Sequence, residues 1–331
     1  MSDVQEVKPQ NEEYANEAPS KRGFMAGFRA HCKRFWWIYL IAFIIVVLVV
    51  VLPVIYVAYP RIAQRDVDDS TLTITELEIT DPRPDSLHLR VTQRIGTDSK
   101  YHPTLDAFEA TLTLNGSDTP FATLNVPKIK AEDGAISKID QELDLSDLDS
   151  FTEYAKAVMH NETVEFNVYG KTKLKEGGLP KTTVTYDKQV TMKGLNSLKG
   201  FNVSEFSVSL SSGDGPNLSG KVYIPNPSVM TLTMGNLTLD LTIDGQPVGT
   251  AFLTDVVIRP NDNFIDMESY VNQSIVLGLI SDKYKNGIVP VQITGNSSVY
   301  NGEYISYFSD ALASNTLTVE LNLLDGLGGG N

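Results

Sequence analysis

An uninterrupted apolar segment from Phe35 to Ala58 constrains this chain more than any other feature of its sequence. The segment is FWWIYLIAFIIVVLVVVLPVIYVA and contains no charged residue. As a helix it would be about 36 Å long, enough to cross the roughly 30 Å hydrocarbon core of a bilayer. Aromatic residues lie near both ends, where membrane interfaces favour them. We therefore predict a transmembrane helix over residues 35–58, which Pro53 kinks or ends.

The charges beside this segment predict its orientation. Five Lys and Arg residues lie in the 20 residues before it, whereas Arg61 and Arg65 behind it are followed at once by three aspartates. The positive-inside rule then places the N-terminus in the cytosol. A cleaved signal peptide is the alternative, but the apolar run is long, begins late and has no small-residue cleavage site behind it. We expect a single-pass type II signal-anchor protein with residues 1–34 as a disordered cytosolic tail.

Acceptor sites for N-glycosylation agree with this orientation. Seven Asn-X-Ser/Thr sites follow the span and none precedes it. They are Asn115, Asn161, Asn202, Asn217, Asn236, Asn272 and Asn296. We expect a lumenal or extracellular glycoprotein. Cys32, three residues before the span, is either a palmitoylation site or an unmodified thiol near the membrane.

Composition limits what the part after the span can be. Cys32 is the only cysteine, so this part contains no disulfide and must fold by hydrophobic burial. Beyond residue 60 there are 21 Lys and Arg against 36 Asp and Glu, a balance unsuited to nucleic acid. The histidines there, His88, His102 and His160, are too far apart for a zinc motif. We expect no metal and no cofactor.

After Asp69 the hydrophobic pattern changes to a period of two, which is typical of sheets with one face in water. Turn residues separate the alternating runs. The runs lie at 71–79, 87–91, 110–114, 206–210, 229–233, 237–243 and 317–321. Helical periodicity is confined to 146–160, 271–284 and 303–312, and Ser146 with Asp149 resembles a capping box for the first of these. The pattern predicts a mainly β fold.

The two halves of this part repeat the same order of elements. Leu112–Gly116 recurs as Leu241–Gly245, and after a helix in each half Val164–Gly170 recurs as Val289–Gly295. The repetition predicts two tandem β-sandwich domains over 70–195 and 200–325, followed by a Gly-rich tail over 326–331. The alternatives are one large sheet and the chance recurrence of short sequence segments that are common in β proteins.

The second half also carries a family resemblance. It lies in GKVYIPNPS at 220–228, in the Asp-Gly turn at 244–245 and in RPNDN at 259–263. These residues resemble the LEA-2-like (water-stress and hypersensitive-response) domain, in particular its fungal single-pass membrane relatives with a domain of unknown function. The family's Asn-Pro-Asn motif is Asn226-Pro227-Ser228 in this chain. The first half lacks the motif and has only Asp81-Pro82.

This resemblance implies immunoglobulin- or fibronectin-III-like sandwiches without catalytic residues. It also implies a vacuolar membrane location, with the plasma membrane and the endoplasmic reticulum as alternatives, and a role in binding lipid or a partner protein. Apart from the resemblance, Pro227 fixes its own φ and keeps Asn226 out of helical geometry. We expect Asn226, Pro227 and Ser228 to form a structural motif that divides one long strand into two.

Three other motifs suggest chemistry. The segment Gly215–Lys221 resembles a phosphate-binding loop, but Val222 replaces the magnesium ligand and a strand follows, so we expect a turn. An acidic cluster suggests calcium but lacks the central glycine of a hand-type loop, and acids also favour a helix N-terminus. An aromatic stripe predicts either ordinary core or the wall of a lipid groove. The cluster is Asp144, Asp147, Asp149 and Glu153, and the stripe is Tyr304, Tyr307, Phe308 and Leu312.

Together these features predict a non-enzymatic, membrane-anchored protein whose tandem domains bind lipid or an unidentified membrane protein beside the bilayer. Such a protein needs a hydrophobic groove or an exposed apolar patch. A structural or adhesive cell-surface glycoprotein, the first alternative, would have a closed core and a polar surface. A glycan-acting enzyme, the second, would need two carboxylates about 5–10 Å apart in a cleft.

The predicted orientation can be tested with protease and glycosidase. Protease added to sealed, right-side-out microsomes should remove the N-terminal tail and spare everything after Arg61, because the bilayer protects the lumenal part. Glycosidase treatment after detergent lysis should then increase the electrophoretic mobility of the protected fragment. Digestion of the C-terminal part in sealed vesicles, or seven unmodified asparagines in a glycosylating host, would contradict the lumenal orientation.

Overall fold

The computed structural model describes residues 23–209 and 215–323, with side chains from Trp36 onward. The chain divides into two compact units, Met1–Ala58 and Tyr59–Asn331. The first contains helix α1 (Gly23–Pro53) and a short π-helix (Val54–Ala58). The change of helix type directly after Pro53 follows from the missing proline N–H and the clash of its ring with the preceding turn.

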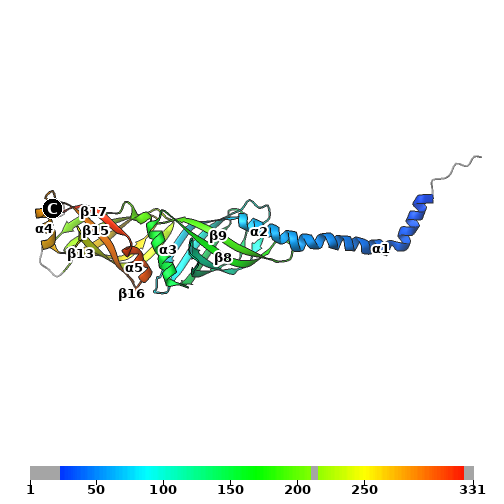
Figure 1. The fold of residues 1–331 in the computed structure, drawn as a ribbon, viewed down its shortest axis with the longest axis horizontal. Coiled ribbons are helices and arrows are strands. Elements are labelled where there is room, and N and C mark those ends of the chain that lie inside the picture. Colours follow the sequence, from blue (N-terminus) through cyan, green and yellow to red (C-terminus); the bar gives the residue numbers. More distant parts are fainter. Residues whose placement is uncertain (1–22, 210–214, 324–331) are drawn as a thin grey trace, which may run out of the picture. The chain divides into compact units, whose positions relative to one another are not determined.

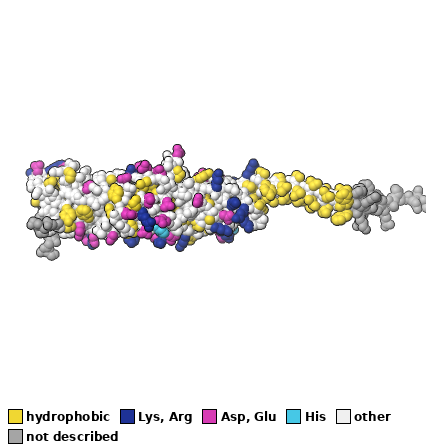
Figure 2. Space-filling model, turned by 90° about the horizontal axis from the view of Figure 1, so that it is seen from below, with side chains coloured by type: hydrophobic (Ala, Val, Ile, Leu, Met, Phe, Trp, Pro, Cys, Tyr) yellow, Lys and Arg dark blue, Asp and Glu magenta, His cyan; other side chains and the backbone are white. Residues whose placement is uncertain are grey.

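The helical stretch Trp36–Asp69 is long and apolar enough to cross a membrane. Hydrophobic side chains cover the first part of this stretch in Figure 2, and no charged residue occurs between Trp36 and Ala58. The predicted apolar helix is therefore present. That it crosses a membrane, its orientation and the organelle all stay predictions. The tail over residues 1–22 lies outside the described residues.

The unit Tyr59–Asn331 is mainly β, as predicted (Figure 1). Its helices are α2 (Tyr59–Asp69), α3 (Leu148–His160), α4 (Gln273–Asp282) and α5 (Ser306–Ala313), with a 3₁₀ turn at Asn196–Leu198. Its first nine strands are β1 (Thr71–Thr80), β2 (Ser86–Gly96), β3 (Thr104–Leu105), β4 (Phe108–Leu114), β5 (Pro120–Val126), β6 (Ile129–Lys130), β7 (Ile136–Asp144), β8 (Thr163–Lys175) and β9 (Thr182–Lys193). The others are β10 (Asn202–Val208), β11 (Leu218–Asn226), β12 (Met230–Ile243), β13 (Gln246–Ile258), β14 (Asn261–Val271), β15 (Ile288–Tyr300), β16 (Glu303–Tyr304) and β17 (Thr316–Asn322).

Strand pairing repeats between the two halves of this unit. In the first half β1, β2 and β7 pair in that order, and so do β5, β4, β8 and β9. The second half contains the corresponding orders β10-β11-β14 and β13-β12-β15-β17. Helix α3 connects β7 to β8, and α4 connects β14 to β15. The repeat found in the sequence is thus a repeat of topology.

The two halves are joined by a parallel pair. Leu77, Glu78 and Ile79 of β1 lie opposite Met230, Thr231 and Leu232 of β12. This pairing makes β1, β2 and β7 part of an 11-stranded sheet, while the second sheet has six strands. One hydrophobic core runs through both halves. The division into domains at 195–200 stays a prediction; that segment contains the 3₁₀ turn.

The Asn-Pro-Ser segment divides a strand as expected. Strand β11 ends at Asn226, and β12 begins at Met230 with different neighbours, β1, β13 and β15 instead of β10 and β14. Asn226 is 2% exposed, and its Nδ2 donates to the Met230 carbonyl at 2.7 Å. Its Oδ1 accepts from Ser228 N at 2.9 Å and from Ser228 Oγ at 2.6 Å. The buried side chain replaces the ladder bonds lost at the break.

Two local predictions need correction or refinement. Asp147, and not Ser146, caps α3, accepting a hydrogen bond from Ser150 N at 2.7 Å. The predicted helix over 303–312 begins only at Ser306, because Glu303 and Tyr304 form the short strand β16. Every other predicted helix and alternating run coincides with an observed element to within a few residues.

Replacing Asn226 by Ala should destabilise the protein by roughly 2–4 kcal/mol, because buried partners lose their hydrogen bonds. The measurement is urea unfolding of the full-length protein in micelles, followed by far-UV circular dichroism. Asn125→Ala, which removes an exposed side chain from β5, is the matched control. Equal unfolding midpoints for the two variants would contradict the role assigned to Asn226.

Candidate functional site: an apolar cavity in each half

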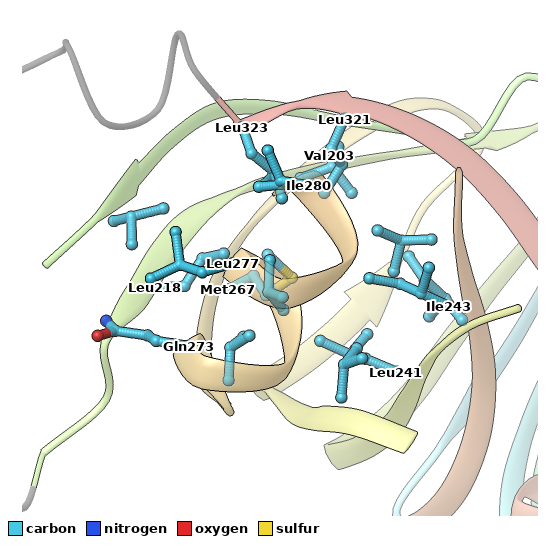
Figure 3. Close-up of a pocket in the computed structure, with 16 residues that line it drawn as sticks. Val203, Leu218, Leu241, Ile243, Met267, Gln273, Leu277, Ile280, Leu321 and Leu323 are labelled. Carbon is cyan, nitrogen blue, oxygen red and sulfur yellow. The ribbon is translucent and has the colours of Figure 1, made fainter. Parts of the chain in front are cut away.

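The second half encloses a cavity beneath helix α4. Its volume is about 70 Å³, and all its lining side chains except Gln273 are apolar. Strand residues from β10, β11, β12, β14 and β17 surround α4 in Figure 3, with Leu218 on one side and Leu241 and Ile243 on the other. Leu277 and Ile280 face this space from the helix. The cavity lies between α4 and the strands of the second half.

Helix α4 is held far less tightly than its counterpart α3. Five residues of α3 are buried, and Phe151 packs edge-on against Tyr307 of α5 with ring centroids 5.0 Å apart. In α4 one residue, Val276, is buried, while Leu277 is 48% exposed. Within the described ranges the main neighbour of α4 is strand β13. Few buried contacts mean that a segment opens at low free-energy cost.

The empty space itself has an energetic cost. Core cavities destabilise proteins by about 24 cal/mol per Å³, so a 70 Å³ cavity costs roughly 1.7 kcal/mol. Filling it with hydrocarbon would recover this amount and add burial of apolar surface. The cavity is smaller than the roughly 150 Å³ that accommodates benzene in an engineered core. A long hydrocarbon chain can therefore enter only if α4 moves outward.

The first half contains a corresponding interior cavity, also of about 70 Å³. A smaller one of about 40 Å³ lies near α2 and shares Leu72, Gln93, Val126 and Tyr186 with it, so the two are neighbours. Burial raises the pKa of Tyr186 to about 12, which keeps its hydroxyl protonated and neutral. The lining of the larger cavity comes from both sheets and from α3.

Helix α2 is fixed to the end of the first half by polar contacts. Gln64 both donates to and accepts from the backbone of Thr185 on the edge strand β9, each at 2.8 Å. Lys188, which is 7% exposed, donates to the carbonyls of Asp68, at 2.8 Å, and Ser70. Burial lowers the pKa of Lys188, because desolvation disfavours its charged form. These contacts also satisfy backbone groups of an exposed sheet edge.

The aromatic stripe on the last helix is core and not a groove wall. Tyr307, Phe308 and Leu312 are at most 9% exposed, and Tyr307 also stacks edge-on against Phe308 at 4.7 Å. Tyr304 is 52% exposed on β16. None of the four lines the cavities described above. The cavity under α4 was not among the predicted sites, and its one local signal in the sequence is the apolar run Ile275–Ile280.

The other predicted motifs have structural roles. Lys221 of the loop-like segment lies within β11 and pairs with Glu205 at 2.9 Å, so the segment is a turn and a strand. Asp147 of the acidic cluster caps α3, and the Ser150 N–H lowers the pKa of its carboxyl. Within residues 23–209 and 215–323, no group of three or more His, Cys, Asp or Glu could hold a metal ion.

Charged side chains are interspersed over the surface of the β unit (Figure 2). Asp140 accepts from His88 at 2.7 Å and from Arg90 at 3.0 Å, and these contacts lower the pKa of its carboxyl. His160 lies 2.8 Å from Ser314 Oγ, but that hydroxyl already donates to the Ala311 carbonyl. His160 is then the donor, so this pair links α3 to α5 and does not activate a nucleophile.

Six of the seven glycosylation asparagines are exposed, and Asn217 is half-buried. The Nδ2 of Asn217 donates to the Val271 carbonyl at 2.8 Å, so its amide is engaged. Asn272 caps α4 by accepting from Ile275 N at 3.2 Å. Cys32 lies in α1, but its side chain is outside the described part. Occupancy of these sites and palmitoylation of Cys32 stay predictions.

One family model matches the chain. It is described as a protein of unknown function (DUF3712) and matches residues 119–241, from the start of β5 into β12. The match covers little more than a third of the chain and crosses from the first half into the second. Comparison with curated proteins found no match. The LEA-2 resemblance therefore stays a prediction.

Solved structures give only weak likenesses. An adhesin from Mobiluncus mulieris with disulfide, isopeptide and ester cross-links is 10% identical and covers 76% of this chain and 96% of its own, with a TM-score of 0.21. The sporulation control protein Spo0M from Bacillus subtilis is 11% identical. The match covers 65% of this chain and 98% of Spo0M, with a TM-score of 0.19. The periplasmic chaperone SfaE is 10% identical. The match covers 76% of this chain and 100% of SfaE, with a TM-score of 0.14. At these scores no functional argument follows.

Stabilising α4 should reduce its opening. Gly278 is exposed in this helix and an added Cβ would meet no atom within 4 Å, so Gly278→Ala should stabilise α4 by about 1 kcal/mol. Hydrogen exchange of the α4 amides should slow roughly five-fold as a result. The control is Gly295→Ala, whose Cβ would clash with Leu312 and destabilise the protein. Unchanged exchange in Gly278→Ala would contradict local opening of α4.

Proposed function

We propose that this protein is a membrane-anchored, non-enzymatic module that binds the hydrocarbon chain of a lipid beneath α4. The observation that carries the proposal is the cavity under that helix, with hydrocarbon or thioether lining except for Gln273. Concave, mostly apolar sites of this kind are where proteins bind apolar ligands. The apolar helix near the N-terminus supplies the anchor that would keep such a site close to a bilayer.

The ligand must be mainly hydrocarbon. No charged side chain lines the cavity, so a charged group inside it would lose its hydration without a partner. Gln273, at the first turn of α4, is the one polar lining residue, and its amide donates to the Ser209 carbonyl at 2.7 Å. A lipid would therefore place its chain inside and leave its head group outside.

Entry requires that α4 act as a movable lid. A chain longer than a few carbons exceeds the available volume, whereas the apolar face of α4 can cover it after moving outward. The lid residues Val276, Leu277 and Ile280 would then pack on the ligand in place of the strand side chains. The vacuolar membrane remains our expectation for the location, from the family resemblance alone. A partner protein docking on α4, and a purely adhesive role, are the alternatives to the lipid.

The test is lipid analysis of the full-length protein purified from its host membrane, with a variant that fills the cavity. Val291→Phe adds a ring to a lining position on β15 and should reduce co-purifying lipid at least five-fold, because the chain and the ring compete for one space. Extraction followed by mass spectrometry gives lipid per protein.

Val256→Phe is the matched control. Val256 is 1% exposed on β13 and lines none of the three cavities, so the same overpacking occurs without blocking the site. It should retain the wild-type amount of lipid. Equal lipid in both variants, or no lipid in the wild-type protein, would overturn the proposed function.

A further inference from the structure

The β unit is acidic as a whole, but the end that carries the β8–β9 turn is basic. Segments 127–132 and 171–181 together contain six lysines and two glutamates. Beyond residue 60, by contrast, 21 Lys and Arg stand against 36 Asp and Glu. Figure 2 shows Lys and Arg side chains gathered at the right-hand end of the β unit. A patch whose sign opposes that of the whole unit attracts an anionic partner.

Helix α2 begins at this basic end. The hydrogen bonds of Gln64 with Thr185, and of Asp68 with Lys188, show that α2 runs beside β9 in the same direction. Tyr59, the first residue of α2, therefore lies nearest to the β8–β9 turn, and it packs against the hydrophobic cluster there. This residue directly follows the apolar segment, so the chain leaves that segment at the basic end. A membrane crossed by the apolar helix would have its surface beside these lysines.

Three of the lysines form a row on β8. Lys171, Lys173 and Lys175 alternate with the buried Thr172 and Leu174, so all three point away from the core. Alternate residues of a strand lie roughly 7 Å apart. Like charges at this spacing repel one another, and an anionic surface relieves the repulsion.

Two further lysines extend the row around Asp106. Lys181 donates to the Asp106 carboxylate at 2.5 Å. This bond, together with the nearby charges of Lys181, Lys128 and Lys173, lowers the pKa of the Asp106 carboxyl. One carboxylate thus lies among three ammonium groups, and the cluster keeps a net positive charge.

The acids of the two segments neutralise little of the remaining charge. Glu132 pairs with Lys130 at 3.0 Å, and Glu176 is half-buried in the β8–β9 turn. Within residues 36–209 and 215–323, no ion pair includes Lys128 or any of the three lysines in the row on β8. Four exposed ammonium groups are therefore available to an external anion.

We propose that these lysines bind the anionic head groups of phospholipids in the membrane that the apolar helix crosses. The basic surface consists of Lys128, Lys171, Lys173, Lys175 and Lys181. Each ammonium group attracts a phosphate as a point charge, and each basic residue near an anionic lipid surface strengthens attachment about five-fold. The inference rests on the membrane anchor of the proposed function and is independent of the cavity beneath α4.

The test uses the full-length protein in two kinds of nanodisc, one of phosphatidylcholine alone and one with about 30% phosphatidylserine. A soluble reagent acetylates exposed lysines, and mass spectrometry gives the rate at each site. At about 50 mM salt, Lys128, Lys173 and Lys175 should react roughly three-fold more slowly in the anionic discs, because head groups cover them. This protection should disappear at about 500 mM salt, since salt screens the attraction. Lys199 and Lys285, exposed in other parts of the β unit, should react equally in both discs.

A triple variant supplies a second measurement. Lys128→Gln, Lys173→Gln and Lys175→Gln combined should lower the phosphatidylserine that stays bound to the protein when it is released from mixed discs. Native mass spectrometry should find roughly ten-fold less than in the wild type, because three attractive charges are lost.

The matched control is Lys193→Gln, Lys199→Gln and Lys285→Gln combined, which removes the same charge from exposed lysines elsewhere and should retain the wild-type amount. Val291→Phe, which fills the cavity under α4, should also retain it. Loss of lipid from that cavity would then leave the basic surface intact, so the two proposals can fail separately.

Three results would overturn this inference. The first is an equal rate of acetylation of the basic surface in the two kinds of nanodisc. The second is protection that persists at about 500 mM salt, which would show that the bilayer shields these lysines without electrostatic binding. The third is equal retention of phosphatidylserine by the two triple variants.

Discussion

Hydrophobic burial between facing strands, without any disulfide, is the constraint on which the β unit depends. The chain's single cysteine, Cys32, precedes the apolar segment, so no disulfide joins the strands of residues 59–331. Side chains of alternating positions must therefore fill the space between two sheet faces in each half. The parallel pair between β1 and β12 extends this burial from one half into the other. Where filling is incomplete, apolar cavities result, and they occur in corresponding places of the repeat.

The two halves differ in what closes their cavities. Helix α3 is clamped by α5 through the contact of Phe151 with Tyr307, whereas α4 has mainly β13 as its neighbour. Each cavity has one glutamine in an otherwise largely apolar lining, Gln93 in the first half and Gln273 in the second. One topology thus contains two apolar cavities that differ in how firmly a helix covers them. This difference follows from a few residues on a repeated framework.

The sequence was sufficient for the elements that local chemistry determines. Alternating hydrophobic runs predicted the strands, and Asn226-Pro227 predicted a strand break. The sequence segments that recur in both halves predicted that the order of elements repeats. The cap of α3 was misplaced by one residue because Ser146 and Asp147 are both good N-caps. The stripe on α5 was ambiguous, since periodicity reports that a face is apolar but not what covers it.

The cavities could not be predicted from the sequence, because unfilled volume depends on how distant side chains pack. The loose packing of α4 likewise depends on which described elements lie beside it, and no local sequence pattern encodes that. Gln93 did leave a signal. In Leu87-His-Leu-Arg-Val-Thr-Gln93 the glutamine occupies the core-facing phase of the alternation, where a polar residue indicates a special role.

An experimental structure of the full-length protein, purified from its host membrane without added lipid, tests the central claim most directly. Our account predicts elongated density of a hydrocarbon chain between α4 and the strands of the second half, with α4 displaced outward. A cavity without such density, closed by an α4 whose apolar residues fill it completely, would contradict lipid binding at this site.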